Sequence, residues 1–387
     1  MDFKNISNTR KKNLRTLAKR MNQRNAGSFP ITNELLACFH FAMSEDENEF
    51  LLQLGTEFHS YDELMELSGY PQEKFETISR SCLKKGFLMM RRDKEKCERY
   101  VISSIMPGWF ELYLSDGEIN ENRQEFVQYL ETFFQSWGKF NIFPVRNLMN
   151  YYVKKGSRPN ISVGIVAGES KNAKIEVNAK LDISLTNIYP STDVNKLIEK
   201  HGTNNSIALV HCFCRQWRKM LGESCKFDVP NEACIVIGEL SHHVVKYEIG
   251  RYIDADEAMN VIHETHKKGA VHSVFYEKDG QEMAICNCCW DCCGVLGSYN
   301  RALLPMHYKS YYLAVLQDAE SCIGCKKCEK HCPTRAITVQ EKQVSLEAKK
   351  CIGCGQCVDQ CPRDCFHLEP KERNVLLPLF KKTLARL

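Results

Sequence analysis

The sequence repeats one cysteine pattern near its C-terminus, as CIGCKKCEKHCP over residues 322–333 and CIGCGQCVDQCP over residues 351–362. Each of the four cysteines in the first copy recurs 29 residues later in the second, so Cys322 corresponds to Cys351 and Cys332 to Cys361. Three cysteines spaced in this way can wrap one metal–sulfur cube, and the glycine inside each copy lets the backbone approach it closely. The fourth cysteine precedes a proline and is expected to point away, toward the other copy.

Each copy has the form C-x2-C-x2-C-x3-C-P, and in this pattern the segment resembles the bacterial two-cluster ferredoxins. The resemblance covers about 50 residues and implies a pseudo-twofold ferredoxin fold that passes single electrons through two adjacent [4Fe–4S] clusters. The ligand sets it implies are Cys322, Cys325, Cys328 and Cys361 for one cluster, and Cys351, Cys354, Cys357 and Cys332 for the other. Structural zinc is the alternative, which eight cysteines in a doubled pattern disfavour. Cys365 aligns with Ala336 in the repeat, and we expect it to be a packing residue, as we do Cys38, Cys82 and Cys97.

Nine further cysteines lie upstream of the repeat, and we expect them to form a central metal site. They are Cys212, Cys214, Cys225, Cys234, Cys286, Cys288, Cys289, Cys292 and Cys293. In an extended segment, residues i and i+2 face the same side, so the pair Cys212 and Cys214 can reach one centre, as can Cys286 and Cys288. Soft cysteine thiolates bind zinc and iron–sulfur clusters equally well. The attached ferredoxin segment favours one or more additional iron–sulfur clusters, while the number and nuclearity of the central clusters stay open.

The composition indicates a globular protein of a reducing compartment. The chain has 387 residues and 21 cysteines, and its N-terminus carries charge without the apolar core of a signal peptide. No apolar stretch is long enough to cross a membrane. We therefore expect a cytoplasmic protein without a transmembrane segment, whose cysteines bind metal or carry redox chemistry instead of forming disulfides.

The pattern of apolar and polar residues predicts an α+β protein in five parts. We expect a basic N-terminal arm over residues 1–30, a central cysteine-rich α+β domain over 116–310, a ferredoxin domain over 311–370 and a basic C-terminal tail over 371–387. Between the arm and the central domain, residues 31–115 read as helices followed by a hairpin. That order resembles a winged helix, with residues 71–85 in the position of the recognition helix.

These features suggest three functions. The first is an electron-transfer protein that passes single electrons between a redox partner protein, or oxidoreductase complex, and the central cysteine site. The second is an iron–sulfur oxidoreductase with a catalytic central cluster. The third is a redox-sensing winged-helix regulator, which is disfavoured because residues 31–115 carry a net charge of −6 and DNA-binding modules present a basic face. The whole chain also resembles uncharacterised iron–sulfur dicluster proteins of anaerobes, which implies anaerobic electron transfer.

Overall fold

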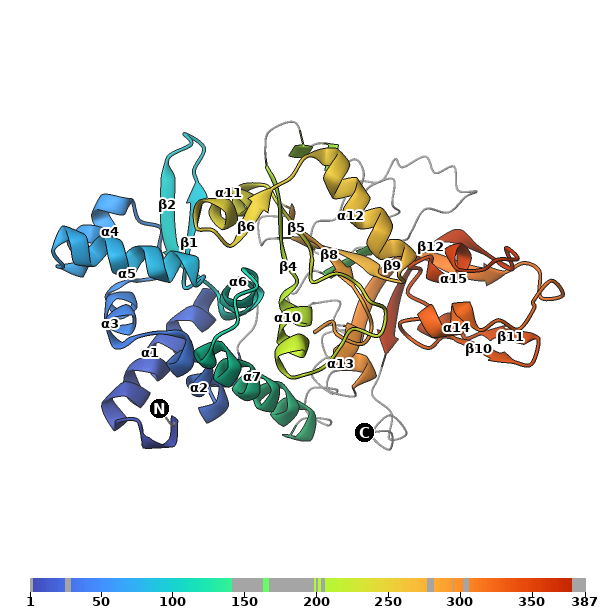
Figure 1. Cartoon of the computed structure of the whole chain (residues 1–387), viewed down its shortest axis with the longest axis horizontal. Helices are drawn as coiled ribbons and strands as arrows, with labels where there is room; N and C mark the ends of the chain where they lie inside the picture. Colours follow the sequence, from blue (N-terminus) through green and yellow to red (C-terminus); the bar gives the residue numbers. More distant parts are fainter. Residues whose placement is uncertain are drawn as a thin grey trace. The chain divides into compact units, whose positions relative to one another are not determined.

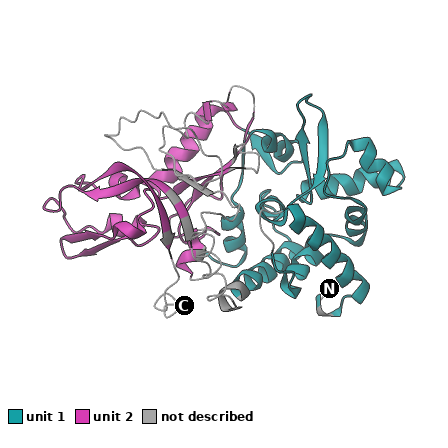
Figure 2. Ribbon diagram, turned by 180° about the vertical axis from the view of Figure 1, so that it is seen from behind, with its two compact units in different colours: residues 1–137, 208–223, 238–252 teal, residues 138–207, 224–237, 253–387 magenta. Residues whose placement is uncertain are grey.

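The computed structural model describes residues 3–24, 29–140, 163–166, 198–199, 201–202, 206–276, 282–294, 296–301 and 306–377. Helices and strands are mixed throughout these residues, which makes this an α+β protein (Figure 1). The chain divides into two compact units, coloured teal and magenta in Figure 2. Unit 1 comprises residues 1–137, 208–223 and 238–252, and unit 2 comprises residues 138–207, 224–237 and 253–387.

Unit 1 is mainly helical and contains one two-stranded hairpin. Its helices are α1 (Asn8–Arg24), α2 (Asn33–Ala42), α3 (Glu45–Gln53), α4 (Tyr61–Ser68), α5 (Gln72–Lys84), α6 (Phe110–Leu114), α7 (Glu121–Phe140), α10 (Phe213–Met220) and α11 (Glu239–Lys246). Strand β1 (Leu88–Arg92) pairs antiparallel with β2 (Glu98–Ile102), and β4 (Ile207–His211) pairs antiparallel with β6 (Gly250–Tyr252).

Capping residues set the starts of two of these helices. Ser44 and Glu47 form a capping box at the start of α3, in which each side chain accepts a hydrogen bond from the other residue's backbone N–H. Ser60 and Glu63 do the same at the start of α4. These signals are readable in the sequence, and they fix where the chain turns around the apolar core.

Aromatic side chains fill the core of unit 1. The ring of Trp109 lies 4.3 Å from that of Phe39 and 4.8 Å from that of Phe87, measured between centroids. Phe110 and Phe126 pack edge to face beside it, and all five side chains are fully buried. Each buried aromatic ring of this size removes a large apolar surface from water.

Unit 2 combines a mixed α/β body with the two cysteine repeats. In its sheet, strands β3 (Val163–Val166), β7 (Val271–Tyr276), β8 (Glu282–Cys288) and β5 (Glu232–Ile237) are neighbours in that order. Helix α12 (Ala255–Lys267) packs on this sheet, and α13 (Leu296–Asn300) follows β8 in the chain. Strand β9 (Met306–Leu316) pairs antiparallel with β12 (Phe366–Leu377), as Figure 1 shows.

The cysteine repeats occupy the segment between β9 and β12. This segment contains α14 (Lys327–His331), the hairpin of β10 (Ile337–Gln340) and β11 (Gln343–Leu346), a 3-10 turn at Ala348–Lys350, and α15 (Gln356–Asp359). Because β9 and β12 pair along their lengths, the two ends of the repeat segment are held together. This closes a small unit around its cysteines.

The structure divides the chain differently from the sequence expectation. Residues 8–24 form α1 instead of a free basic arm, because Leu14, Leu17 and Met21 recur at helical spacing and are buried. Residues 371–377 belong to β12 instead of a tail, and residues 378–387 lie outside the described part of the chain. The expected central domain over 116–310 is also divided, since α7, α10 and α11 belong to unit 1 and β9 already begins at residue 306.

Candidate metal centres

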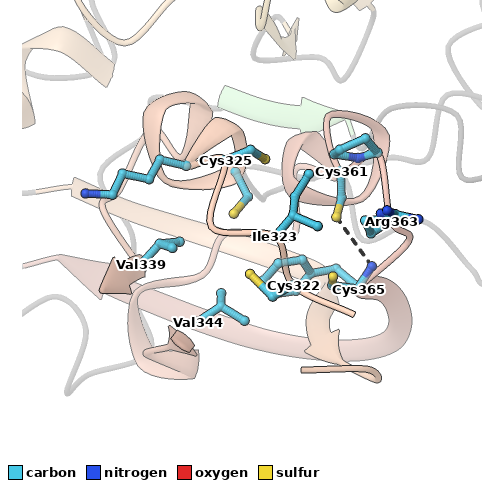
Figure 3. Close-up of a pocket in the computed structure, with 12 residues that line it drawn as sticks. Cys322, Ile323, Cys325, Val339, Val344, Cys361, Arg363 and Cys365 are labelled. Carbon is cyan, nitrogen blue, oxygen red and sulfur yellow. Dashed lines mark hydrogen bonds between the residues drawn. The ribbon is translucent and has the colours of Figure 1, made fainter. Parts of the chain in front are cut away.

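The structure brings one half of the repeat cysteines together around a hollow of about 330 Å³. Cys322, Cys325, Cys328 and Cys361 line this outer hollow, and Figure 3 shows the labelled side chains around it. The backbone N–H of Cys365 donates to Cys361 Sγ at 3.4 Å, drawn as the dashed line. These four cysteines are the set that the resemblance assigns to one cluster.

The other four repeat cysteines line a second hollow of nearly the same size, about 320 Å³. They are Cys332, Cys351, Cys354 and Cys357. The backbone N–H of Ala336 donates to Cys332 Sγ at 3.2 Å, the counterpart of the bond from Cys365 to Cys361 in the outer hollow. The two hollows therefore share their size and their N–H···S contacts, and such contacts are among the features that set the potential of an iron–sulfur cluster.

A glycine with positive φ lies inside each repeat. Gly324 has φ +71 and Gly353 has φ +68, a region that side chains rarely adopt. A Cβ at Gly324 would lie 2.2 Å from the carbonyl oxygen of Glu341, and one at Gly353 would lie 2.3 Å from that of Tyr312. The sequence argument expects these glycines to let the backbone approach a cluster, whereas the contacts that the structure shows are with neighbouring carbonyl oxygens.

The two hollows differ in exposure. Cys325 at the outer hollow is exposed, whereas Cys351, Cys354 and Cys357 at the inner hollow are all buried. Burial raises the pKa of the Cys354 and Cys357 thiols, because a thiolate loses its hydration there.

Three central cysteines form a tight group with one carboxylate. Cys225 lies in the loop after α10, and Cys289 and Cys292 lie in the turn after β8. Cys225 Sγ is 3.6 Å from Cys289 Sγ, and the ligand atoms of these three cysteines and Asp291 all lie within 4.8 Å of one another. Hydrogen bonds from the thiols of Cys289 and Cys292 lower the pKa of the Cys225 thiol, and the same bond with Cys225 raises the pKa of the Cys292 thiol.

A second central group lies at the end of β8. Hydrogen bonds with Cys286 and Cys293, together with burial, raise the pKa of the Cys288 thiol. Cys234 lies on the neighbouring strand β5, one residue before Ile235, which pairs with Ile285 next to Cys286. Cys293 shares an apolar cluster with Cys354 of the inner hollow, and Cys288 packs against that cluster.

The remaining central cysteines lie in unit 1. Cys212 precedes α10 and Cys214 lies in its first turn. The sequence argument placed both on one face of an extended segment; it does not hold here, because the chain enters a helix at residue 213. The structure thus divides the nine central cysteines into groups of different geometry.

Cys38 and Cys82 are buried, while Cys97, expected to be a packing residue, is exposed in the β1–β2 turn.

Polar contacts join helix α15, which borders the inner hollow, to helix α12 and the turn that follows it. The sequence analysis did not predict these contacts. His266 Nε2 contacts Asp359 Oδ2 at 2.9 Å, and Gln356 Nε2 donates to the carbonyl oxygen of Ala270 at 2.7 Å. His272 packs on His266. Burial lowers the pKa of His272 to about 3, so the His272 side chain is neutral. Asp359 and Gln356 belong to α15, which also carries Cys357. Asp291 was missed as well, although it stands between two of the cysteines in CNCCWDCC.

Comparison with known proteins identifies one part of the chain. Residues 314–362 match the family model of the 4Fe–4S dicluster domain, which indicates that this segment binds 4Fe–4S clusters. No curated protein and no solved structure matches the chain significantly. In the described part of the chain, no helix is long and apolar enough to cross a membrane. The dicluster domain and the many cysteines together point to an iron–sulfur protein that transfers electrons.

Proposed function

We propose that this protein relays single electrons from a partner through two [4Fe–4S] clusters to the central cysteine group at the end of β8. The outer cluster is held by Cys322, Cys325, Cys328 and Cys361, and the inner cluster by Cys351, Cys354, Cys357 and Cys332. The receiving group consists of Cys286, Cys288 and Cys293, with Cys234 on the adjacent strand. This group holds a further iron–sulfur centre.

This proposal rests on how deeply the cysteines of each group are buried. Exposure falls from Cys325 at the outer hollow to the buried cysteines of the inner hollow. From there the path continues through one apolar cluster, in which Cys354 and Cys293 both take part. Packed contact of this kind shortens the distance between redox centres and excludes water from the path.

The partner approaches at the outer hollow. Lys326 and Arg363 line it, and Lys327 and Lys330 are exposed on the adjoining helix α14. Basic side chains in this position favour a partner with an acidic docking surface, and the association rate should then fall as ionic strength rises. Ile323, which is 49% exposed at the same hollow, offers an apolar contact beside these charges.

Helix α5, in the recognition-helix position of the winged-helix resemblance, carries no net positive face. The exposed charged side chains of α5 are Glu73, Lys74, Glu76 and Arg80. Lys74 pairs with Asp46, and Arg80 pairs with Glu248 within the same unit. Because both cations are already paired, we do not propose DNA binding for this helix.

The test compares electron entry in three variants of the full chain, purified under strict exclusion of oxygen. Cys325→Ser alters the outer cluster, Cys354→Ser alters the inner cluster, and Cys97→Ser is the control at an exposed thiol. Iron and acid-labile sulfide per chain, with EPR of the reduced protein, establish which clusters each variant retains. Reduction by methyl viologen radical is then followed by rapid mixing and freezing.

We expect Cys325→Ser to slow reduction of every remaining centre, because electrons enter at the outer cluster. Cys354→Ser should leave entry to the outer cluster unchanged and slow reduction of the central group at least tenfold. The proposed order is refuted if the central group in Cys354→Ser is reduced as fast as in the wild type. The proposal that the chain binds two [4Fe–4S] clusters is refuted if the wild type holds fewer than about eight irons per chain.

A further inference from the structure

A single metal ion, and not a cluster, fits the tight group of central cysteines. We propose that Cys225, Cys289, Cys292 and Asp291 bind one tetrahedral zinc ion. This inference does not depend on the electron relay proposed above, since it concerns side chains that the relay does not use. It rests on the spacing of the ligand atoms, on the local sequence and on an unpartnered carboxylate oxygen.

The spacing of the sulfur atoms distinguishes one ion from a cube. With a Zn–S bond of about 2.3 Å, two thiolates on one tetrahedral ion lie about 3.8 Å apart. Two cysteine sulfurs on different irons of a [4Fe–4S] cube lie about 6.4 Å apart, because each points outward from its own corner. The observed separation of 3.6 Å between Cys225 Sγ and Cys289 Sγ fits the single ion. A cube cannot fit between four ligand atoms that all lie within 4.8 Å of one another.

The other cysteine sets of unit 2 provide an internal comparison. Among the residues that the structure describes, neither hollow of the dicluster segment brings three of its cysteines within that limit of one another. The wide sets in the dicluster segment are those that match a 4Fe–4S family. The tight group therefore differs from them in geometry and not only in position.

The local sequence around the tight group is compatible with a single bound ion. Cys289 and Cys292 have the C-x2-C spacing that places two thiolates on one ion, and Cys225 comes from a loop 64 residues earlier in the chain. The backbone N–H of Lys226 donates to Asp291 Oδ2 at 2.6 Å, which already ties the two loops together. Phe227 and Ala270 are buried beside Cys289 and Cys292, whereas Cys225 and Asp291 are half-buried. Four protein ligands leave no open coordination position, as in structural zinc sites.

Asp291 supplies the fourth ligand. Its Oδ2 accepts the bond from Lys226, whereas its Oδ1 is buried and has no hydrogen-bond partner among the described residues. A buried carboxylate oxygen without a partner is costly, and a bound cation removes that cost. Three thiolates and one carboxylate complete a tetrahedral zinc site of the structural kind, in which the ion cross-links the loop after α10 to the turn after β8.

The test uses the full chain purified without oxygen and then washed with a chelator. Zinc and iron per chain are measured by elemental analysis, and the zinc ligands by X-ray absorption at the zinc edge. The variants are Cys289→Ser and Asp291→Asn, with Cys97→Ser as the control at a thiol outside any group. Because the wild type alone gives the metal content and the ligand set, the test survives if a variant fails to fold.

We expect about one zinc per wild-type chain, bound by three sulfurs and one oxygen. Cys289→Ser should lose at least nine-tenths of this zinc while iron and the EPR signals of the dicluster segment are unchanged. Asp291→Asn should retain less zinc than the wild type after the chelator wash. The proposal is overturned if the wild type holds no zinc, if its zinc has only nitrogen and oxygen ligands, or if Cys289→Ser loses about four irons instead.

Discussion

Replacing Gly353 with alanine should destroy the inner half of the dicluster segment. At φ +68 an alanine costs about 1–2 kcal/mol relative to glycine. Its Cβ would lie 2.3 Å from the carbonyl oxygen of Tyr312, so the two must separate by about 1 Å to reach ordinary contact. Tyr312 cannot move freely, because it is buried in β9, pairs with β12 and accepts a hydrogen bond from Ser310 Oγ at 2.6 Å. Disturbing that bond adds about 1 kcal/mol, for a total of about 2–3 kcal/mol.

Two matched substitutions separate the causes of this loss. Gly324→Ala meets the same strain at φ +71 and a similar collision, 2.2 Å from the carbonyl oxygen of Glu341. Glu341, however, is exposed in the turn between β10 and β11, where the backbone can yield. Gly69→Ala in unit 1 has φ +61 with open space around its Cβ, and should cost only about 1 kcal/mol of conformational strain in its own unit.

The assay is iron and sulfide per chain after anaerobic purification, together with guanidinium unfolding followed by circular dichroism. We expect Gly353→Ala to lose close to half of the iron of the dicluster segment, Gly324→Ala to lose much less, and Gly69→Ala to lose none. The reasoning is wrong if Gly353→Ala retains full iron, or if Gly324→Ala is the more damaging of the two. Equal losses would mean that the positive φ, and not the rigidity of β9, decides the outcome.

Three further predictions concern unit 1, and guanidinium unfolding tests each of them. Burial lowers the pKa of His243 to about 3, so below about pH 6.5 only the unfolded state binds a proton at this residue. The free energy of unfolding of the wild type should therefore fall by about 2 kcal/mol between pH 7 and pH 5 because of His243. In His243→Gln the free energy of unfolding should depend on pH by that much less. Burial raises the pKa of Glu111 to about 7, so Glu111→Gln should be about 3 kcal/mol more stable than the wild type at pH 8 and no more stable at pH 4. Arg123 and Asp116 form an ion pair with both side chains 4% exposed, so Arg123→Met should cost about 3–5 kcal/mol, most of which Asp116→Asn should restore in the double variant.

The sequence predicts the dicluster segment well because its signal is local and doubled. The cysteines assigned to each set line one hollow in the structure, and equivalent positions of the repeat, Ala336 and Cys365, make equivalent N–H···S bonds. Hydrophobic spacing likewise predicts the buried stripe of α5, with Phe75, Ile78 and Cys82. In both cases the residues that matter lie within a few turns of one another in the chain.

Where the sequence prediction differs from the structure, the deciding partner lies far along the chain. The eight basic residues of the first thirty suggest an arm, yet Leu14 and Leu17 are buried, and Arg10 donates to the carbonyl oxygen of Met43 at 2.8 Å. Residues 371–377 look like a charged tail, and only their pairing with β9 makes them a strand. Strand pairing over such a distance leaves no mark in the local pattern.

The cysteines show most clearly what spacing along the chain leaves undecided. The sequences Cys322-Ile-Gly-Cys325 and Cys289-Trp-Asp-Cys292 have the same C-x2-C spacing. In the first, a glycine has φ +71, and the two cysteines line a hollow together with Cys328 and Cys361. In the second, neither intervening residue has a positive φ, and the thiols converge with Cys225 to distances that suit one ion. The cysteines alone therefore indicate a metal site. The proposed distinction between a cluster and a single ion depends on the residues between the cysteines and on the third thiol that the fold brings in.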